Sequence, residues 1–215
     1  MKNQGLLQQY RTTIDKGSDH GFTLVEMLIT MGIVSIVMAA AFSLFASYSR
    51  SNTVQTISAD LQQDIRAGIS FMEQDIRSAG LNPRELGSGV GFTEASRTKF
   101  TFVSDSDFNG VVPGLDTDGA TIITPEEQIT YEFTGGELKR NNINETATLL
   151  SNVDSVTFTY LGSTNNPLSG NPLPTASLEN IRSVEIDITL KEGAGQYGEI
   201  TRSIHTRIYC RNTNL

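Results

Sequence analysis

The feature that most constrains this chain is a stretch without charged residues from Met27 to Ser49, which directly follows a single carboxylate at Glu26. A helix from Phe22 to Tyr48 would be on the order of 40 Å long at ~1.5 Å per residue, which exceeds the ~30 Å hydrocarbon thickness of a bilayer. A charged side chain at the bilayer centre costs roughly 2.5–3.5 kcal/mol on insertion scales. The sequence therefore predicts a membrane-spanning helix in which Glu26 has a function.

The residues from Gly21 to Glu26, Gly-Phe-Thr-Leu-Val-Glu, resemble the prepilin cleavage and methylation motif of type IV pilins and type II secretion pseudopilins. The resemblance implies that a prepilin peptidase cuts the Gly21–Phe22 bond and methylates the new amine of Phe22. It also implies a pilin-like fold and a role for Glu26 in assembly with other minor and major pilins or pseudopilins. The alternative is an ordinary signal anchor with an isolated glutamate.

The negative charge of Glu26 can stabilise such an assembly. Cleavage places a positive amine at the start of a helix, where the macrodipole disfavours a cation. In a bundle of staggered helices, Glu26 of one subunit can neutralise the Phe22 amine of its neighbour, because opposite charges attract more strongly away from water. We therefore expect this carboxylate to lack a partner in the single subunit and to gain one in the polymer.

Residues 1–21 form the predicted cytoplasmic leader. They carry three basic and two acidic side chains, and this slight positive excess favours a cytoplasmic N-terminus. The expected location is the bacterial inner membrane, as a single-pass protein with its head outside the cytoplasm, and afterwards a pilus or pseudopilus. The net charge of −8 argues against nucleic-acid binding.

The helix is predicted to continue beyond the membrane, from Phe22 to about Ala79. Its transmembrane part covers about 22–48, and its amphipathic part covers 49–79. Gly80, with Pro83 shortly after it, gives a stop signal. The segment 22–80 is therefore treated as one long N-terminal helix.

One apolar stripe runs along the amphipathic part, with residues recurring at steps of three or four. The stripe consists of Val54, Ile57, Leu61, Ile65, Ile69, Met72 and Ile76. Charged and amide side chains, Asp75 among them, are placed on the opposite face. The stripe needs a cover, which the rest of the chain must supply.

Residues 81–215 are predicted to form a β-rich head. Alternating strand patterns occur at Lys99–Val103, Ile129–Phe133, Glu137–Arg140, Val153–Leu161, Ile181–Lys191 and Glu199–Tyr209. Gly135-Gly136 predicts a tight hairpin, and Gly193-Ala194-Gly195 predicts another near the C-terminus. Leu161–Thr175 is typical of a surface loop. An antiparallel sheet on the amphipathic helix gives an α+β fold, as the resemblance also implies.

One loop of the head has the spacing of calcium ligands. Asp105, Asp107 and Asn109 stand at alternate positions before a glycine, Val111 offers a carbonyl at the seventh position, and Asp116 stands at the twelfth. Further ligands could come from Asp118, Glu126 or Glu127. The strand-like flanks exclude an EF-hand domain, and the alternative is a solvated turn. Ca²⁺ is therefore the one candidate cofactor.

No set of residues in the sequence organises catalysis. His20 lies in the leader, and His205 alternates with polar residues on a late strand, which predicts a surface position. Cys210 has no partner motif, and Gly87–Gly91 lacks the spacing of a nucleotide-binding fingerprint. We therefore expect a structural protein rather than an enzyme.

The stretch Asp75–Gly80 resembles the helix end of the minor pilins called PilW, and the minor pseudopilin J of type II secretion is similar in size and layout. The predicted function is a minor type IV pilin that primes assembly or sits near the pilus tip. The alternatives are a J-like minor pseudopilin and, from another class, a stand-alone membrane-anchored module that binds calcium or another ligand. Glu26→Ala separates the stand-alone module from the assembly subunits, because only an assembly protein should lose its function.

Overall fold

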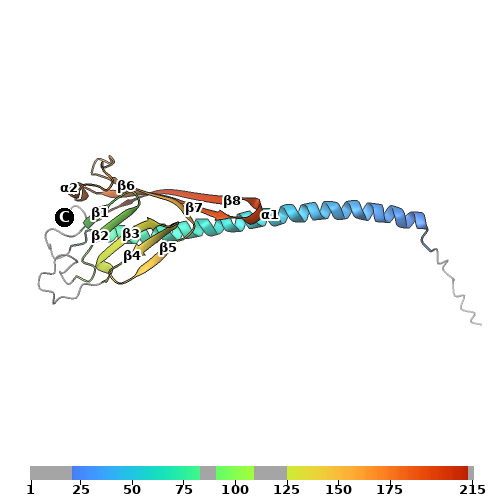
Figure 1. Ribbon diagram of the computed structural model, residues 1–215, viewed down its shortest axis with the longest axis horizontal. Helices are drawn as coiled ribbons and strands as arrows, with labels where there is room; N and C mark the ends of the chain where they lie inside the picture. Colours follow the sequence, from blue (N-terminus) through green and yellow to red (C-terminus); the bar gives the residue numbers. More distant parts are fainter. Residues whose placement is uncertain (1–20, 83–90, 109–124, 213–215) are drawn as a thin grey trace, which may run out of the picture. The chain divides into compact units, whose positions relative to one another are not determined.

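The computed structural model describes residues 21–82, 91–108 and 125–212 of the chain. The elements in chain order are α1 (Leu24–Ser78), β1 (Gly91–Ala95), β2 (Lys99–Val103), η1 (Pro125–Glu127), β3 (Gln128–Thr134), β4 (Glu137–Asn141), β5 (Thr146–Leu150), β6 (Val153–Leu161), α2 (Thr175–Leu178), β7 (Ser183–Gly193), η2 (Gly195–Tyr197) and β8 (Glu199–Tyr209) (Figure 1). The chain divides into two compact units, Met1–Tyr48 and Ser49–Leu215.

The first unit contains the apolar part of α1. Every residue from Gly21 to Tyr48 is exposed in the single chain. Among the described residues, α1 is the one helix that is long and apolar enough to cross a membrane, judged by length and composition. The long apolar N-terminal helix predicted from the sequence is therefore present, and its surface is open to lipid or to neighbouring helices.

The ends of α1 lie close to the predicted ones, at Leu24 and Ser78. Two residues after the helix, Gly80 has a φ of +77°, a conformation that glycine adopts without steric cost. Its N–H donates to the carbonyl oxygen of Val103 at 3.2 Å. The end of the helix is thus fixed to the end of β2.

In the second unit, the apolar stripe of α1 is covered as predicted. Its buried members are Leu61, Ile65, Ile69, Met72 and Ile76, and Val54 and Ile57 are partly buried against the same core. Asp75 departs from the predicted pattern, because its side chain is largely covered rather than solvated. The helix therefore contributes one carboxylate to the interior as well as its apolar stripe.

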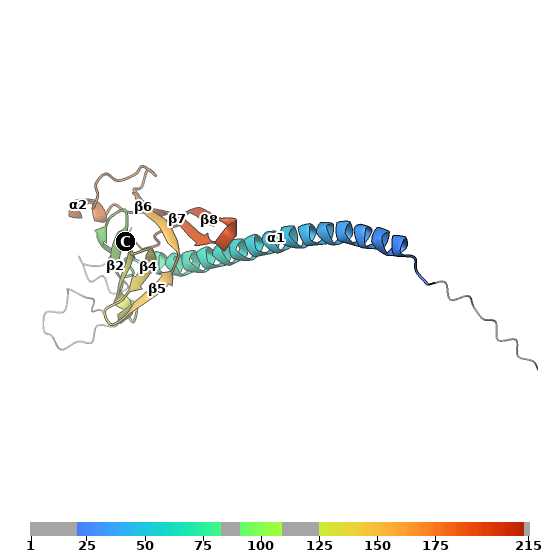
Figure 2. The same ribbon diagram turned by 45° about the vertical axis from the view of Figure 1, so that its right-hand side comes forward.

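Two antiparallel sheets cover the stripe, where the sequence predicted one. The strand order is β1-β2-β3-β4-β5 in the first sheet and β6-β7-β8 in the second. Figures 1 and 2 agree in placing the second half of α1 between β5 on one side and the β7–β8 hairpin on the other. Strands β2, β3, β4, β6, β7 and β8 correspond to predicted ones, whereas β1 and β5 were not predicted.

Glycines lie in the turns of both hairpins that the sequence predicted, a tight one between β3 and β4 and a longer one through η2 between β7 and β8. Gly135 and Gly136 have φ values of +60° and +79°, and they join the last pair of β3 and β4, Thr134 and Glu137. Strands β7 and β8 pair over their whole length, from Ser183–Tyr209 to Gly193–Glu199. Both predicted hairpins are therefore confirmed.

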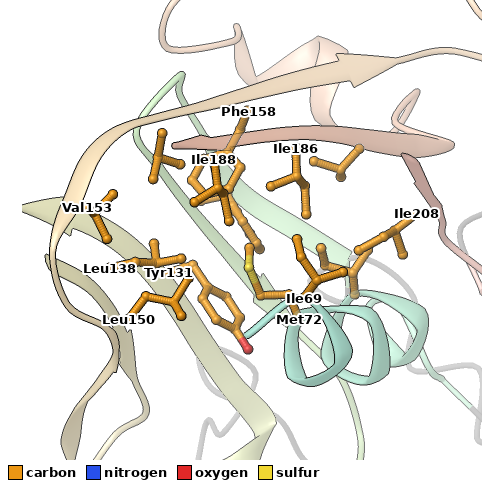
Figure 3. Close-up of a cluster of buried hydrophobic side chains, with 14 of the residues drawn as sticks. Ile69, Met72, Tyr131, Leu138, Leu150, Val153, Phe158, Ile186, Ile188 and Ile208 are labelled. Atoms are coloured by element: carbon orange, nitrogen blue, oxygen red, sulfur yellow. The ribbon is translucent and has the colours of Figure 1, made fainter. Parts of the chain in front are cut away.

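The core joins α1 to both sheets. In Figure 3, Met72 reaches from α1 into the space between Tyr131 of the first sheet and Ile186 of the second. The ring of Phe100 packs at 5.1 Å on Tyr131 and, edge to face, at 4.8 Å on Phe158 of the second sheet. Such aromatic pairs favour these offset and edge-on geometries. One continuous core therefore holds the head together.

Candidate functional site

The predicted cleavage motif lies at the start of α1. Gly21, Phe22 and Thr23 have no regular secondary structure, and Phe22 is 82% exposed. The peptide bond between Gly21 and Phe22 is therefore outside the helix and free of helical hydrogen bonds among the described residues. A peptide bond in this position is accessible to a peptidase.

Thr23 and Glu26 form a reciprocal cap on the first turn of the helix. The backbone N–H and the Oγ1 hydroxyl of Thr23 donate to Oε2 of Glu26 at 2.9 and 3.0 Å. In return, the backbone N–H of Glu26 donates to Oγ1 of Thr23 at 3.2 Å. This is a capping box, in which a threonine and a glutamate three residues later satisfy each other's backbone donors.

The capping box corrects one expectation. The carboxylate of Glu26 was predicted to lack a partner in the single subunit, yet it is hydrogen-bonded within its own chain. Both bonds end on Oε2, so within the described residues Oε1 is left for a further donor. The Thr-x-x-Glu spacing in the sequence already carried this signal, and sequence reasoning missed it because it considered only the charge of Glu26.

Two of the predicted calcium ligands, Asp105 and Asp107, lie in a cluster of three carboxylates. Oxygens of Asp105, Asp107 and Glu127 lie within 4.8 Å of one another, with Asp105 and Glu127 buried and Asp107 exposed. The backbone connects them, because the N–H of Ser104 donates to the carbonyl oxygen of Glu127 at 2.9 Å. An all-oxygen donor set of this kind suits Ca²⁺. The remaining predicted ligands, Asn109, Val111 and Asp116, lie outside the described residues.

Of the two glutamates that could join the cluster, Glu127 lies in it and Glu126 does not. The side chain of Glu126 turns the other way and accepts from Nη2 of Arg140 at 2.5 Å and from Nδ2 of Asn142 at 2.9 Å. The hydrogen bond from Arg140 holds the pKa of Glu126 below its ordinary value. The turn η1 therefore presents one carboxylate to the cluster and one to β4.

A second polar network connects this turn to α1. Asp75 of α1 accepts from the Tyr131 hydroxyl at 2.6 Å and from Nε of Arg140 at 2.7 Å, both at Oδ2. Tyr131 is fully buried, and burial together with the Asp75 charge raises the pKa of its hydroxyl. Arg140 thus bridges the helix and Glu126. Sequence reasoning missed this network, because nothing local in the sequence pairs residues so far apart.

The other titratable residues give no catalytic constellation among the described residues. His205 is exposed on β8, as predicted, with Nδ1 2.7 Å from Oδ1 of Asp187 on the neighbouring strand. Burial raises the pKa of the Cys210 thiol to about 12, so the thiol is protonated and unreactive at neutral pH.

The comparisons with known proteins concern the start of the chain. A family model described as the prokaryotic N-terminal methylation motif matches residues 16–42, a range that includes Gly21, Phe22 and Glu26. No curated protein matches the chain. The motif match thus coincides with the capped helix start and with the first part of the apolar helix.

Proposed function

The chain carries the N-terminal methylation motif and the pilin-like α+β architecture of a type IV pilin or pseudopilin precursor, and we propose that it is a minor type IV pilin. In this role it primes assembly of a pilus or enters it near the tip after prepilin peptidase has removed residues 1–21. Members of this family are structural subunits rather than enzymes. The large two-sheet head and the likeness of Asp75–Gly80 to PilW minor pilins support the minor role.

The observation that carries the proposal is the helix start itself. A cut between Gly21 and Phe22 creates a free amine on the residue immediately before the Thr23–Glu26 capping box. Among the described residues, both hydrogen bonds to the Glu26 carboxylate end on Oε2, so Oε1 can accept a hydrogen bond from another subunit. A neighbouring subunit that offers its Phe22 amine can therefore bind this carboxylate while the cap stays closed.

Energetics favour such a pairing inside a bundle of helices. A hydrogen bond that involves a charged group contributes about 1.5–3 kcal/mol, roughly twice a neutral one. The exposed apolar surface of α1 up to Tyr48 provides the low-dielectric surroundings in which the pair attracts most strongly. The subunit would thus wait in the inner membrane, head outside the cytoplasm, until other pilins bury this surface.

The test compares Glu26→Ala with Glu73→Ala, which removes a partly exposed glutamate of the same helix that is paired with Arg77. Both variants should insert into the membrane, and N-terminal sequencing after treatment with prepilin peptidase should find Phe22 as the first residue in each. Only Glu26→Ala should fail to appear in sheared pili. Pili that contain Glu26→Ala at the natural level, or a mature chain that retains residues 1–21, would refute the proposal.

A J-like minor pseudopilin is the second candidate, because it would use the same motif, helix and peptidase. The two differ in the filament that the chain enters. Deletion of the chain should abolish surface pili and twitching in the first case, and protein secretion in the second.

The calcium site remains a prediction, and so does the alternative of a stand-alone binding module. The carboxylates of Asp105, Asp107 and Glu127 support calcium binding by their proximity. A stand-alone module would keep its ligand binding and its function in the Glu26→Ala variant. Loss of function in that variant, with calcium binding intact, would count against the module.

A further inference from the structure

We infer that the open edge of β5, together with the flank of α1 beside it, binds an extended basic segment of another protein chain, which adds a sixth strand to the first sheet. The surface lies wholly in the second unit and uses neither Phe22 nor Glu26. The inference therefore goes beyond the proposed entry into a filament, and it can fail or succeed separately.

The edge of β5 is built to accept a strand. Among the described strands β5 pairs with β4 alone, so its other edge is open. Its sequence is Thr-Ala-Thr-Leu-Leu, and residues Thr146, Ala147 and Thr148 are exposed. Exposed edge strands are usually protected by lysine, proline or a bulge on the outer side. β5 has no lysine or proline, and its register with β4 shifts only between Thr148 and Leu150, so the stretch Thr146–Thr148 is regular and uncharged and can pair with another chain.

Two contacts show which side of α1 borders this edge. Gly68 faces Leu150 at the end of β5 so closely that a Cβ on Gly68 would lie 2.9 Å from the leucine side chain. Two turns further along, Asp75 binds Arg140 of β4. The row of α1 residues between Gly68 and Asp75 therefore runs alongside β5 and β4.

Phe71 stands at the outer border of that row. It lies three residues after Gly68 and is 58% exposed, and it is the one exposed large apolar side chain in the described part of α1 after Tyr48. On β5, Ala147 is paired in register with Arg140, so both side chains share the face of the sheet that contacts α1. Phe71 and Ala147 thus form an apolar shelf next to the open edge.

The row of α1 that contains Phe71 becomes acidic toward the N-terminal end of the helix. Asp60, Asp64, Ala67 and Phe71 follow one another at steps of four, three and four, so they lie in one row on the helix surface. All four are exposed, and neither aspartate takes part in an ion pair with another described residue. A segment that pairs with β5 would therefore meet an apolar shelf and two free negative charges.

The charges of Asp60 and Asp64 indicate which kind of segment would pair with β5. The segments of the head outside the described residues, 83–90, 109–124 and 213–215, together contain a single basic residue, Arg84. They do not complement Asp60 and Asp64. A segment of another chain, with an apolar side chain flanked by lysine or arginine, complements both the charges and the shelf.

The test uses a fluorescently labelled peptide of alternating valine and threonine with lysines at both ends, and full-length protein in detergent micelles. Fluorescence anisotropy should report saturable binding that weakens as salt is raised. Phe71→Ala should weaken binding about tenfold, and so should the double change Asp60→Asn with Asp64→Asn. Phe108→Ala, which removes another exposed phenylalanine, should leave binding unchanged, and Glu26→Ala should as well.

Peptide controls separate strand addition from other modes of binding. The same peptide with glutamates in place of the lysines should not bind, and a version with N-methylated backbone should lose binding because it cannot pair with an edge strand. All the changed residues are exposed, so the melting temperature should stay constant. Absence of any binding, equal binding to the Phe71→Ala protein, or binding of the N-methylated peptide would each overturn the inference.

Discussion

Removal of the largely covered Asp75 should destabilise the head more than removal of any exposed side chain of α1. Its carboxylate is the shared acceptor for the buried hydroxyl of Tyr131 and for Nε of Arg140. Breaking a buried charged pair costs about 3–5 kcal/mol. Because Arg140 keeps its second partner, Glu126, we expect Asp75→Ala to lower the free energy of unfolding by ~3 kcal/mol, the lower end of this range.

The assay is thermal unfolding of the full-length protein in detergent micelles, followed by near-UV circular dichroism of the tyrosines. For a unit the size of Ser49–Leu215, a loss of ~3 kcal/mol lowers the melting temperature by about 6–12 °C. Tyr131→Phe removes one hydrogen bond to a carboxylate and leaves the Asp75–Arg140 pair in place, so it should cost about 1.5 kcal/mol, the lower end of the range for such a bond. The double variant should cost less than the sum, because both changes remove the same bond.

Glu73→Ala is the matched control, since Glu73 is ion-paired with Arg77 on the same helix but is far less covered than Asp75. Exposed pairs contribute about 0–1 kcal/mol, so this variant should melt close to the natural protein. The reasoning is refuted if Asp75→Ala melts like Glu73→Ala, or if Asp75→Ala and Tyr131→Phe prove additive.

Three further predictions concern the helix start and the carboxylates of the head. Thr23→Val removes the hydroxyl of the capping box and should weaken the first turn of α1 by ~1 kcal/mol. Hydrogen exchange followed by mass spectrometry should therefore show faster exchange of the amides in this turn. Thr23→Ser keeps the hydroxyl and should behave as the natural chain. Glu126 has a lowered pKa in the folded state. Its contribution to the free energy of unfolding is therefore present above the unfolded pKa of ~4.3, and it is lost as the pH falls through the lower folded pKa. Melting temperatures should therefore differ between the natural chain and Glu126→Gln at neutral pH and converge in acid. Calcium should raise the melting temperature of the natural chain and not that of Asp107→Asn, a change at the exposed member of the cluster.

Each of these has a clear contrary result. Equal exchange rates in Thr23→Val and Thr23→Ser would mean that the hydroxyl does not support the cap. A constant difference between the natural chain and Glu126→Gln at every pH would exclude the titration of this carboxyl as its cause. An equal calcium effect in the natural chain and in Asp107→Asn would place the ion elsewhere.

The sequence predicted those parts of the fold that rest on local patterns. The stripe from Val54 to Ile76 follows from helical periodicity, and the β3–β4 and β7–β8 hairpins follow from glycines at the turns. Strand β5 was missed, because the alternation of polar and apolar residues in Thr-Ala-Thr-Leu-Leu is short and ends in two consecutive leucines. The division of the head into two sheets was missed too, since strand patterns do not say which strands pair.

The candidate sites show the same limit. Gly21, Phe22 and Glu26 were recognisable because they lie within six consecutive residues, and their roles stay predictions. The approach of Glu127 to Asp105 and Asp107 depends on how β3 pairs with β2, which places the start of one strand beside the end of the other. Asp75 was assigned to the solvent, because helical periodicity cannot reveal a tyrosine and an arginine that arrive from distant strands.

The capping box has a consequence for maturation. Thr23 and Glu26 both lie on the C-terminal side of the expected cut, so precursor and processed subunit begin their helix with the same hydrogen bonds. Proteolysis would then alter the charge at the chain end without refolding anything. The first turn of the helix would therefore be the same whether the leader is removed before or after the chain folds.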